Sequence, residues 1–137
     1  MPGVGFTGTS RGLTAAQKAA LGHVLDMLRD EVHHGDCVGA DATCDELCEA
    51  RGLPRVAHPG TDAAGHSPQR ANCDAETVRA PKPYLVRNRD IVDETEWLIA
   101  CPEGQEVRRS GTWATVRYAR KRGRAVVYVW PSGWVER

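Results

Sequence analysis

The chain has 137 residues, of which 18 are Lys or Arg and 18 are Asp or Glu, so its formal net charge at pH 7 is zero. A chain without net charge has no global field that collects nucleic acid or anionic membrane, which disfavours a polycationic DNA-binding protein. The length is typical of one domain, and we expect residues 1–137 to form a single domain. The longest apolar runs, such as Ala125–Trp130, are too short to span a bilayer.

Strand-like and helix-like patterns alternate along the chain. Strands are expected over Gly3–Thr7, Glu31–Gly35, Leu53–His58, Glu96–Pro102 and Arg124–Trp130. Helices are expected over Thr14–Asp30, Cys37–Arg51, Tyr84–Asp93 and Ser110–Arg122. Because parallel strands need helical crossovers, this alternation predicts an α/β fold. We expect a doubly wound parallel sheet of about five strands in the order 3-2-1-4-5, with helices on both faces.

Local signals refine this assignment at three places. Thr14 and Gln17 match a capping box, in which each side chain binds a free backbone N–H group at the start of a helix. Pro54 and Pro59 flank the third expected strand, and we place that strand at the side of the sheet, where a ladder N–H can be spared. The segment Gly60–Pro83 has no apolar periodicity and is expected to be a mobile loop that partly covers the ligand site.

Ligands of doubly wound sheets bind outside the carboxyl ends of the strands, and three loops of this chain meet that description. The first contains Gly8, Thr9, Ser10 and Arg11, which offer close backbone approach, two hydroxyl groups and a positive charge to an anion. An ordinary glycine-rich turn explains the same residues equally well.

The second loop follows the second expected strand. Gly35 and Gly39 permit tight turns there, and Asp36 or Asp41 is placed to cap the following helix. Asp41 is equally suited to accept hydrogen bonds from a ribose hydroxyl group. Capping is the favoured interpretation for an isolated Asp at a helix start.

The third loop, Arg108–Thr112, opens the helix that follows the fourth expected strand. The free N–H groups and the positive dipole end of that helix point at any bound anion, and Ser110 and Thr112 add hydroxyl groups around Gly111. This loop is the best phosphate-binding candidate in the sequence.

The preceding helix adds Arg87 and Asn88 to the same candidate site. The planar fork of an arginine suits phosphate oxygens, and Arg87 is interpreted as such a fork. A solvated helix face, on which Arg87 and Arg89 pair with Asp90 and Asp93, is the alternative.

These segments together resemble a known family. The resemblance to the core of DNA-processing protein A is carried, in order, by Arg87–Val92, Trp97–Pro102, Ser110–Thr115 and Gly123–Val126. That family has an R-N-R-I-I helix, an S-G-(S/A)-x-x-T-A helix start and a G-R-x-V strand in the same order. Together with the early loops of the chain, these four motifs extend the resemblance over nearly the whole chain, except the Gly60–Pro83 segment.

The early loops are similar to those of the wider SLOG superfamily, which joins DNA-processing protein A to the Lonely Guy phosphoribohydrolases. The matching segments are Gly5–Arg11 and the H-G-x-x-x-G-A-D string His34–Asp41. The resemblance implies a Rossmann-like, often dimeric, nucleotide-binding fold that holds a phosphate or nucleotide in these loops. The residues assigned to that site are Gly8, Thr9, Ser10, Arg11, Gly35, Asp36, Gly39, Asp41, Arg87, Asn88, Ser110, Gly111, Thr112 and Thr115.

One departure from the Lonely Guy pattern bears on activity. Those hydrolases carry P-G-G-x-G-T-x-x-E, and this chain has Thr115 at the position of the catalytic Glu. A hydroxyl group neither acts as a carboxylate base nor stabilises oxocarbenium charge, so no catalytic residue is assigned. Asp36, Asp41 or Glu103 would have to substitute in an enzyme.

Three hypotheses therefore stand side by side. The first is binding of a phosphorylated nucleoside, the second is hydrolysis of a nucleotide at its N-glycosidic bond, and the third is single-stranded DNA binding of the kind that assists recombination. The basic residues that would form a DNA-binding face are Arg87, Arg89, Arg108, Arg109, Arg117, Arg120, Lys121 and Arg122. The zero net charge disfavours the third hypothesis.

The sequence gives no cofactor motif and no metal motif. Zinc ligands would have to come from Cys37, Cys44, Cys48 and Cys73 with His58 or His66, but there is no C-x-x-C pair. Cys44 and Cys48 lie on the apolar helical stripe and are expected in the core, and Cys37 and Cys101 have no ordered histidine partner that would make a nucleophile. His33 and His34 are expected to be hydrogen-bonded residues at a strand end.

The remaining expectations concern the cellular location of the protein, the packing of Trp113 and the oligomeric state. No basic stretch followed by an apolar segment opens the chain, and its five cysteines cannot all pair, so we expect a cytoplasmic protein with reduced thiols and no membrane partner. Trp113 is expected to pack against the sheet rather than stack on a base. The resemblance implies a homodimer, for which Tyr118 and Trp134 offer spare aromatic surface.

Overall fold

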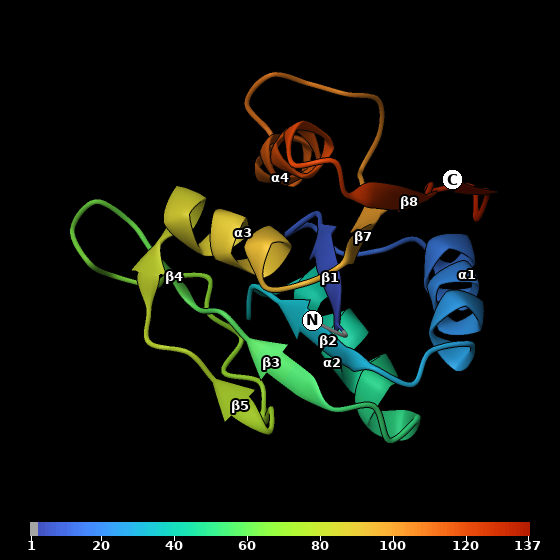
Figure 1. Ribbon diagram of the computed structural model, residues 1–137, viewed down its shortest axis with the longest axis horizontal. Coiled ribbons are helices and arrows are strands. Elements are labelled where there is room, and N and C mark those ends of the chain that lie inside the picture. Colours follow the sequence, from blue (N-terminus) through green and yellow to red (C-terminus); the bar gives the residue numbers. More distant parts are fainter. Residues whose placement is uncertain (1–2) are drawn as a thin grey trace.

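The computed structural model describes residues 3–137 (Figure 1). The helices are α1 (Ala15–Asp26), α2 (Ala40–Ala50), α3 (Tyr84–Asp93) and α4 (Gly111–Lys121). The strands are β1 (Gly3–Gly8), β2 (Glu31–His34), β3 (Arg55–Ala57), β4 (Gly60–Thr61), β5 (Thr77–Val78), β6 (Lys82–Pro83), β7 (Trp97–Cys101), β8 (Ala125–Val129) and β9 (Val135–Glu136). Within this described part of the chain, no helix has the length and apolar character needed to cross a bilayer.

The main sheet has the strand order β5-β3-β2-β1-β7-β8-β9 (Figure 1). Its five central strands are parallel and follow the expected 3-2-1-4-5 winding, so the predicted Rossmann-like α/β fold is confirmed. The sheet has seven strands rather than about five, because a short strand is added at each side. β5 runs parallel to β3, and β9 turns back to run antiparallel to β8.

The placement of the third expected strand at the side of the sheet is wrong. β3 pairs with β2 on one side and with β5 on the other. Pro54 and Pro59 lie just outside Arg55–Ala57, so neither proline removes an N–H group from the ladder. The flanking prolines therefore mark the ends of this strand, but they do not predict whether it lies at the edge of the sheet.

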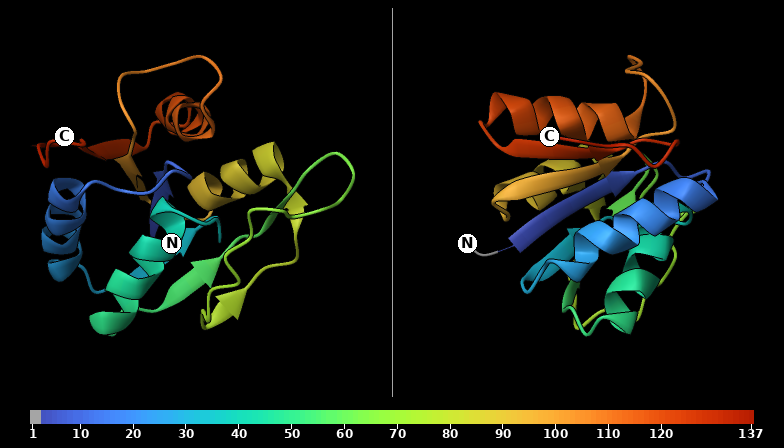
Figure 2. Two further views of the ribbon diagram at one scale, coloured as in Figure 1. Left: turned by 180° about the vertical axis from the view of Figure 1, so that it is seen from behind. Right: turned by 90° about the vertical axis from the view of Figure 1, so that its right-hand side faces the viewer.

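The sheet lies between two helical layers, with α1 and α2 on one face and α3 and α4 on the other (Figure 2). Side chains of a strand alternate between faces, and β7 shows this directly. Ile99 and Cys101 belong to the core under α1 and α2, whereas Leu98 and Ala100 belong to the core under α4. The first core also contains Cys44 and Cys48, so the expected core role of these two cysteines is confirmed.

Backbone geometry fixes where the first two helices begin. The capping box at α1 is present, with the N–H of Gln17 donating to Thr14 Oγ1 at 3.0 Å. α2 begins at Ala40, three residues later than expected, because the chain first turns through Gly39 with φ +88°. A Cβ at Gly39 would lie 2.4 Å from the carbonyl oxygen of Ser10, so only glycine lets the β1 loop contact the start of α2.

The segment 60–83 is largely irregular, as expected, but it contains three two-residue strands. β4 and β6 form a small parallel pair of their own, and β5 extends the main sheet. Hydrophobic periodicity does not predict strands of two residues, because alternation of apolar and polar residues can be recognised only over at least four positions.

Candidate functional site

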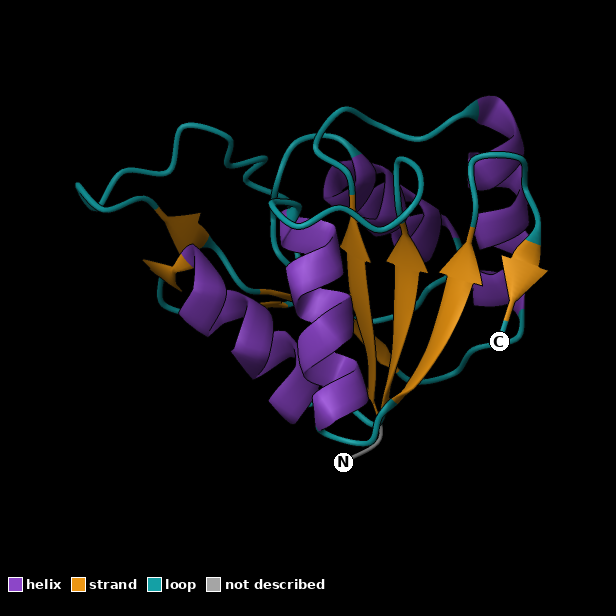
Figure 3. Ribbon diagram, turned by 90° about the horizontal axis from the view of Figure 1, so that it is seen from above, coloured by secondary structure: helices purple, strands orange, loops and turns teal. Residues whose placement is uncertain are grey.

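Two adjoining clefts open at the carboxyl ends of the parallel strands, the end to which the arrowheads of Figure 3 point. The larger cleft has a volume of about 790 Å³ and lies between the loops that follow β1 and β7. The smaller cleft, of about 290 Å³, lies between the ends of β1 and β2 and the helix α3. Ser10 lines both clefts, so they form one continuous region.

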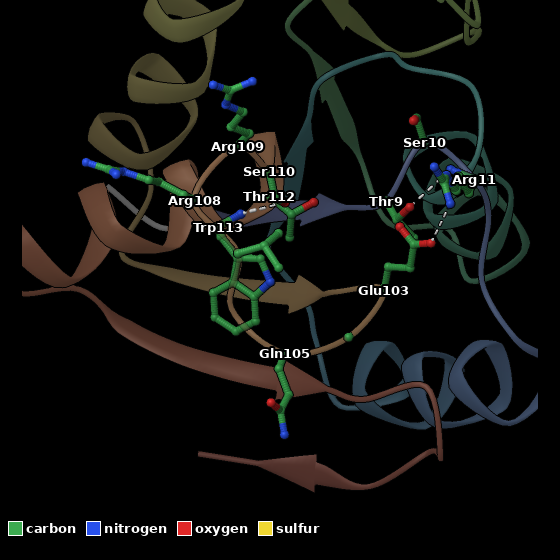
Figure 4. Close-up of a pocket in the computed structure, with 12 residues that line it drawn as sticks. Thr9, Ser10, Arg11, Glu103, Gln105, Arg108, Arg109, Ser110, Thr112 and Trp113 are labelled. Atoms are coloured by element: carbon green, nitrogen blue, oxygen red, sulfur yellow. Dashed lines mark hydrogen bonds and ion pairs between the residues drawn. The ribbon is translucent and has the colours of Figure 1, made fainter.

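One wall of the larger cleft is the loop after β1. The hydroxyl oxygen of Thr9 accepts the N–H of Arg11 at 3.1 Å, which orders the turn. The guanidinium of Arg11 forms an ion pair with Glu103 at 3.1 Å, and both side chains are exposed (Figure 4). An exposed pair of this kind contributes little to stability and is free to rearrange around a ligand.

The opposite wall is the first turn of α4 (Figure 4). Ser110 is the N-cap residue, and its hydroxyl oxygen accepts the N–H of Trp113 at 3.2 Å. A helix leaves its first N–H groups without intrahelical partners, so those of Gly111 and Thr112 are available at the positive end of the helix dipole. Trp113 is buried and stacks on Tyr128, so it packs against the sheet as expected.

The larger cleft is also positively charged. Arg108 and Arg109 directly precede the α4 cap, and both side chains are exposed. They extend away from the Arg11–Glu103 pair (Figure 4). The larger cleft is thus lined by three arginines and one glutamate. It has a local excess of positive charge, although the chain as a whole is neutral.

Asp41 lines the smaller cleft but is engaged within the protein. Its carboxylate accepts the N–H groups of Gly35 at 3.1 Å and Cys37 at 3.2 Å, and so holds the turn between β2 and α2. Burial raises the pKa of Asp41, while the nearby His34 and Arg87 act in the opposite direction. The expected capping role is corrected, because the N-cap of α2 is Gly39 and no side chain caps that helix.

Arg87 also lies in the smaller cleft, and it is buried. Its Nη1 donates to the carbonyl oxygens of Gly35 and, at 3.0 Å, His58, while its Nε donates to the side chain of Asn88 at 2.7 Å. The guanidinium also lies over the ring of Tyr84. Arg87 therefore joins the ends of β2 and β3 to α3, which is neither a solvated helix face nor a free fork for phosphate.

Three of the residues assigned from sequence lie outside both clefts: Asp36, Gly39 and Thr115. Asp36 is buried and binds Arg70 at 3.0 Å and the N–H of Cys73 at 2.8 Å, so it anchors the 60–83 segment. The hydroxyl of Thr115 donates to the carbonyl of Gly111 at 2.9 Å inside α4. Among the residues that line the larger cleft, the one carboxylate is Glu103.

Some of the residues that line the two clefts were not predicted from the sequence. Gln105 and Val107 come from the long loop before α4, and Tyr84 and Gln69 line the smaller cleft. Of these four, only Gln69 belongs to a segment that the sequence placed near the site, since Gly60–Pro83 was expected to cover it. The other three carry no motif and are placed by the fold.

The cysteines near the clefts are not activated. Burial raises the pKa of the Cys37 thiol, and the neighbouring Asp41 carboxylate raises it further. Burial also raises the pKa of Cys101. Both thiols are therefore protonated at neutral pH and are poor nucleophiles.

Two groups of potential metal ligands lie away from the larger cleft, around β2 and β3. They are His33, His58 and Glu94, and His34, Asp45 and Cys73. All four of His33, His34, His58 and Asp45 are buried, and the histidines are hydrogen-bonded as expected.

No protein-family model matches the chain, and no curated protein matches its sequence. Solved structures do match its fold. A molybdenum cofactor binding protein from the phototrophic bacterium Rippkaea orientalis aligns with a TM-score of 0.73 and 16% identity, over 94% of this chain and 76% of that one. TM1055, a structural genomics target, aligns with a TM-score of 0.65 and 16% identity, over 92% of this chain and 72% of that one.

DNA processing protein A from Streptococcus pneumoniae aligns with a TM-score of 0.72 and 20% identity, over 93% of this chain. The match covers 50% of that protein, so this chain spans half of its length. The resemblance to DNA-processing protein A is confirmed at the level of the fold.

Proposed function

We propose that this chain binds a phosphorylated small molecule of the nucleotide class, with a phosphate group at the start of α4. The observation that carries this proposal is the first turn of α4 itself, which is capped by Ser110 and opens into the larger cleft beside Arg108 and Arg109. Free N–H groups and a positive dipole end are what an anion needs from a helix.

The proposed ligand lies across the larger cleft. Its phosphate receives the N–H groups of Gly111 and Thr112 and the hydroxyl of Thr112, and its remainder extends toward Thr9 and Arg11. A volume of about 790 Å³ falls within the range of small-molecule sites. The exposed Arg108 and Arg109 fold back onto the phosphate and displace water from it.

The expected size of the effect follows from charge-assisted hydrogen bonds, each of which contributes about 1.5–3 kcal/mol. Removing both Arg108 and Arg109 should therefore weaken binding by about a hundredfold or more, since about 1.4 kcal/mol corresponds to a factor of ten. Their exposure means that the free energy of unfolding should stay unchanged.

Calorimetric titration tests this proposal. Nucleoside 5′-monophosphates and the matching nucleosides are titrated into the wild type, an Arg108→Ala/Arg109→Ala variant and an Arg29→Ala control. Arg29 is an exposed arginine just before β2, at the opposite end of the sheet. We expect monophosphates to bind and nucleosides to bind far more weakly, with only the double variant losing affinity. Equal affinity for both ligands, or for all three proteins, contradicts the proposal.

Two further ligands enter the same titration: the molybdenum cofactor, which the name of one structural neighbour supplies, and single-stranded DNA, the ligand of the third hypothesis. DNA binding that depends steeply on salt, without binding of monophosphates, would favour the recombination hypothesis instead. Hydrolysis is tested separately by chromatography. With Thr115 at the Glu position, we expect no release of free base from monophosphates.

We further propose that the chain acts as a cytoplasmic homodimer that pairs through the helices beside the clefts. Leu85 and Val86 are exposed on α3, and Trp134 is exposed near the carboxyl terminus. Tyr118, in contrast, is only partly exposed, and its hydroxyl donates to the Asp93 carboxylate. Light scattering at micromolar concentration should give twice the chain mass, and a Leu85→Glu variant should give the monomer mass.

A further inference from the structure

The cluster of His33, His58 and Glu94 lies under the end of α3, on the opposite face of the sheet from α2. His33 Nδ1 and His58 Nε2 are 2.9 Å apart, and Glu94 Oε1 lies 3.8 Å from the first and 3.9 Å from the second. Three donor atoms from β2, the end of β3 and the end of α3 thus converge on one point. Both histidines are almost fully buried.

The hydrogen bonds of His33 fix which of its nitrogens faces the cluster with a lone pair. Its Nε2 lies 3.0 Å from the carboxylate of Glu31, which accepts and so requires a proton on Nε2. His33 Nδ1 is therefore unprotonated and directed at His58 and Glu94. A carboxylate behind the distal nitrogen of a histidine is the arrangement that orients metal-binding histidines.

The second group of potential ligands fails the same test. His34 Nδ1 accepts the N–H of Asp36 at 3.0 Å, so its proton is on Nε2, which donates to Asp45 at 2.8 Å. Neither ring nitrogen of His34 has a lone pair to offer. The two groups contain similar residues, but only in the first does a histidine direct a lone pair, that of His33 Nδ1, at the other two ligands.

We propose that His33, His58 and Glu94 bind a divalent transition-metal ion, zinc by preference, through two imidazole nitrogens and one carboxylate oxygen. Bonds of about 2.0–2.1 Å in tetrahedral geometry place ligand atoms about 3.3 Å apart, which shifts of about half an ångström achieve from the observed separations. When the metal binds, His58 adopts the tautomer that carries its proton on Nδ1, so that Nε2 holds a lone pair for the metal and the ring stays neutral.

The fourth coordination position faces solvent. A cleft of about 230 Å³ is lined by His58, Arg79 and Glu94 together with residues of the β6 strand and α3. Three protein ligands with an open position are typical of zinc sites that bind water or a substrate, whereas structural sites are closed. The inference is independent of phosphate binding at α4.

The charges around the cluster act in both directions. Glu31, Glu94 and the carboxyl end of the α3 dipole favour a cation. Arg79 and Arg87 oppose it. Arg87 is held by backbone carbonyls, but Arg79 is about half exposed and its Nη2 binds Glu94 Oε1 at 2.8 Å. Arg79 thus occupies the carboxylate that the metal needs, and it must swing away when the metal binds.

The experiment is a metal titration of the full chain after removal of metal by a chelator. Zinc is titrated by calorimetry, and cobalt by the visible absorption that four-coordinate cobalt gives. The variants are Glu94→Gln and His58→Gln, with Glu96→Gln as the matched control, since Glu96 is an exposed carboxylate two residues away. Circular dichroism establishes that each variant is folded.

We expect one zinc ion per chain and four-coordinate cobalt absorption. Glu94→Gln and His58→Gln should each weaken binding by at least about tenfold, while Glu96→Gln leaves it unchanged. Arg79→Ala should strengthen binding several-fold, a change that a merely structural hydrogen-bond network would not produce. The proposal is overturned if the wild type binds neither metal, if both ligand variants bind zinc as tightly as the wild type, or if Cys73→Ser abolishes binding.

Discussion

The two halves of the sheet treat polar side chains in opposite ways. Around β2 and β3 the polar side chains are buried and hydrogen-bonded within the protein, as in His33, His34, Asp36, Asp41, Asp45, Arg55, His58 and Arg87. At the start of α4, beyond β7, the arginines are exposed and the helix N–H groups open into a cleft. Residue type alone is similar in the two halves. Burial makes the first group part of the scaffold, with the His33, His58 and Glu94 cluster as the proposed exception, and leaves the second available to a phosphate ligand.

Because of this difference in burial, substitutions in the two halves should affect different properties of the protein. A buried polar group that loses its partner costs about 1–3 kcal/mol of stability, and more when a charge is involved. An exposed arginine contributes little to stability but contributes directly to the binding of an anion. Changes around β2 and β3 should therefore lower the free energy of unfolding, and changes at α4 should lower affinity.

The largest expected effect is that of Arg87→Ala. The substitution leaves the carbonyls of Gly35 and His58 without their buried donor, and should lower the free energy of unfolding by about 3–5 kcal/mol. Arg108→Ala, the same change at an exposed position, should stay within about 0.5 kcal/mol of the wild type. Urea unfolding measures both. Similar losses at the two positions would remove the distinction between the halves.

A pair of glycines gives the next largest contrast. Gly39→Ala should cost about 2–4 kcal/mol, because φ is +88° and the new Cβ meets the Ser10 carbonyl. Gly111→Ala should cost less than about 0.5 kcal/mol, since nothing lies within 4 Å of a Cβ there. Thermal unfolding of the two variants tests this, and a costly Gly111→Ala would mean that the α4 start is itself packed.

The pH dependence of stability reports on the buried half. Burial, with His33 and Arg79 nearby, lowers the pKa of His58 from 6.5 to about 3. Between these values the unfolded chain takes up a proton that the folded chain refuses, so stability is lost as pH falls below about 6.5, by roughly 1 kcal/mol per pH unit. A His58→Gln variant should lack this component. Parallel pH profiles for the two proteins, measured with chelator, would contradict it.

The helix caps should lose less stability than the Arg87 and Gly39 variants. Ser110→Ala and Thr14→Ala each remove an N-cap hydroxyl and should each cost about 1 kcal/mol. Only Ser110→Ala should also weaken monophosphate binding, because Thr14 caps α1 and lines neither cleft. Calorimetry on the two variants measures the contrast. Equal affinity in both would show that the α4 cap does not contact the ligand.

Most of the fold was predictable from sequence because its elements carry local signals. Periodicity and the capping box placed the four helices and the five central strands, and right-handed crossovers gave their order. The two outer strands were not predictable in this way. β5 and β9 have two residues each, and their pairing with β3 and β8 depends on long-range contacts.

The candidate site was predictable only in part, since sequence does not show burial. Ser110 and Thr112 were found from the helix start, and the structure places them in the larger cleft. Arg87 carried the same motif signal, yet its guanidinium is bonded to backbone carbonyls that no local pattern reveals. The cluster of His33 and Glu94 joins residues far apart in the chain, and no spacing rule brings them together.

An amide-resolved NMR titration with a nucleoside monophosphate tests whether the ligand binds at the start of α4 or around β2, because it observes both halves of the sheet in one spectrum. The N–H groups of Gly35 and Cys37 are already bonded to Asp41, whereas those of Gly111 and Thr112 start α4. We expect the largest shifts at Gly111 and Thr112, with little change at Gly35 and Cys37. Large shifts at Gly35 and Cys37, with Gly111 and Thr112 unmoved, would contradict it.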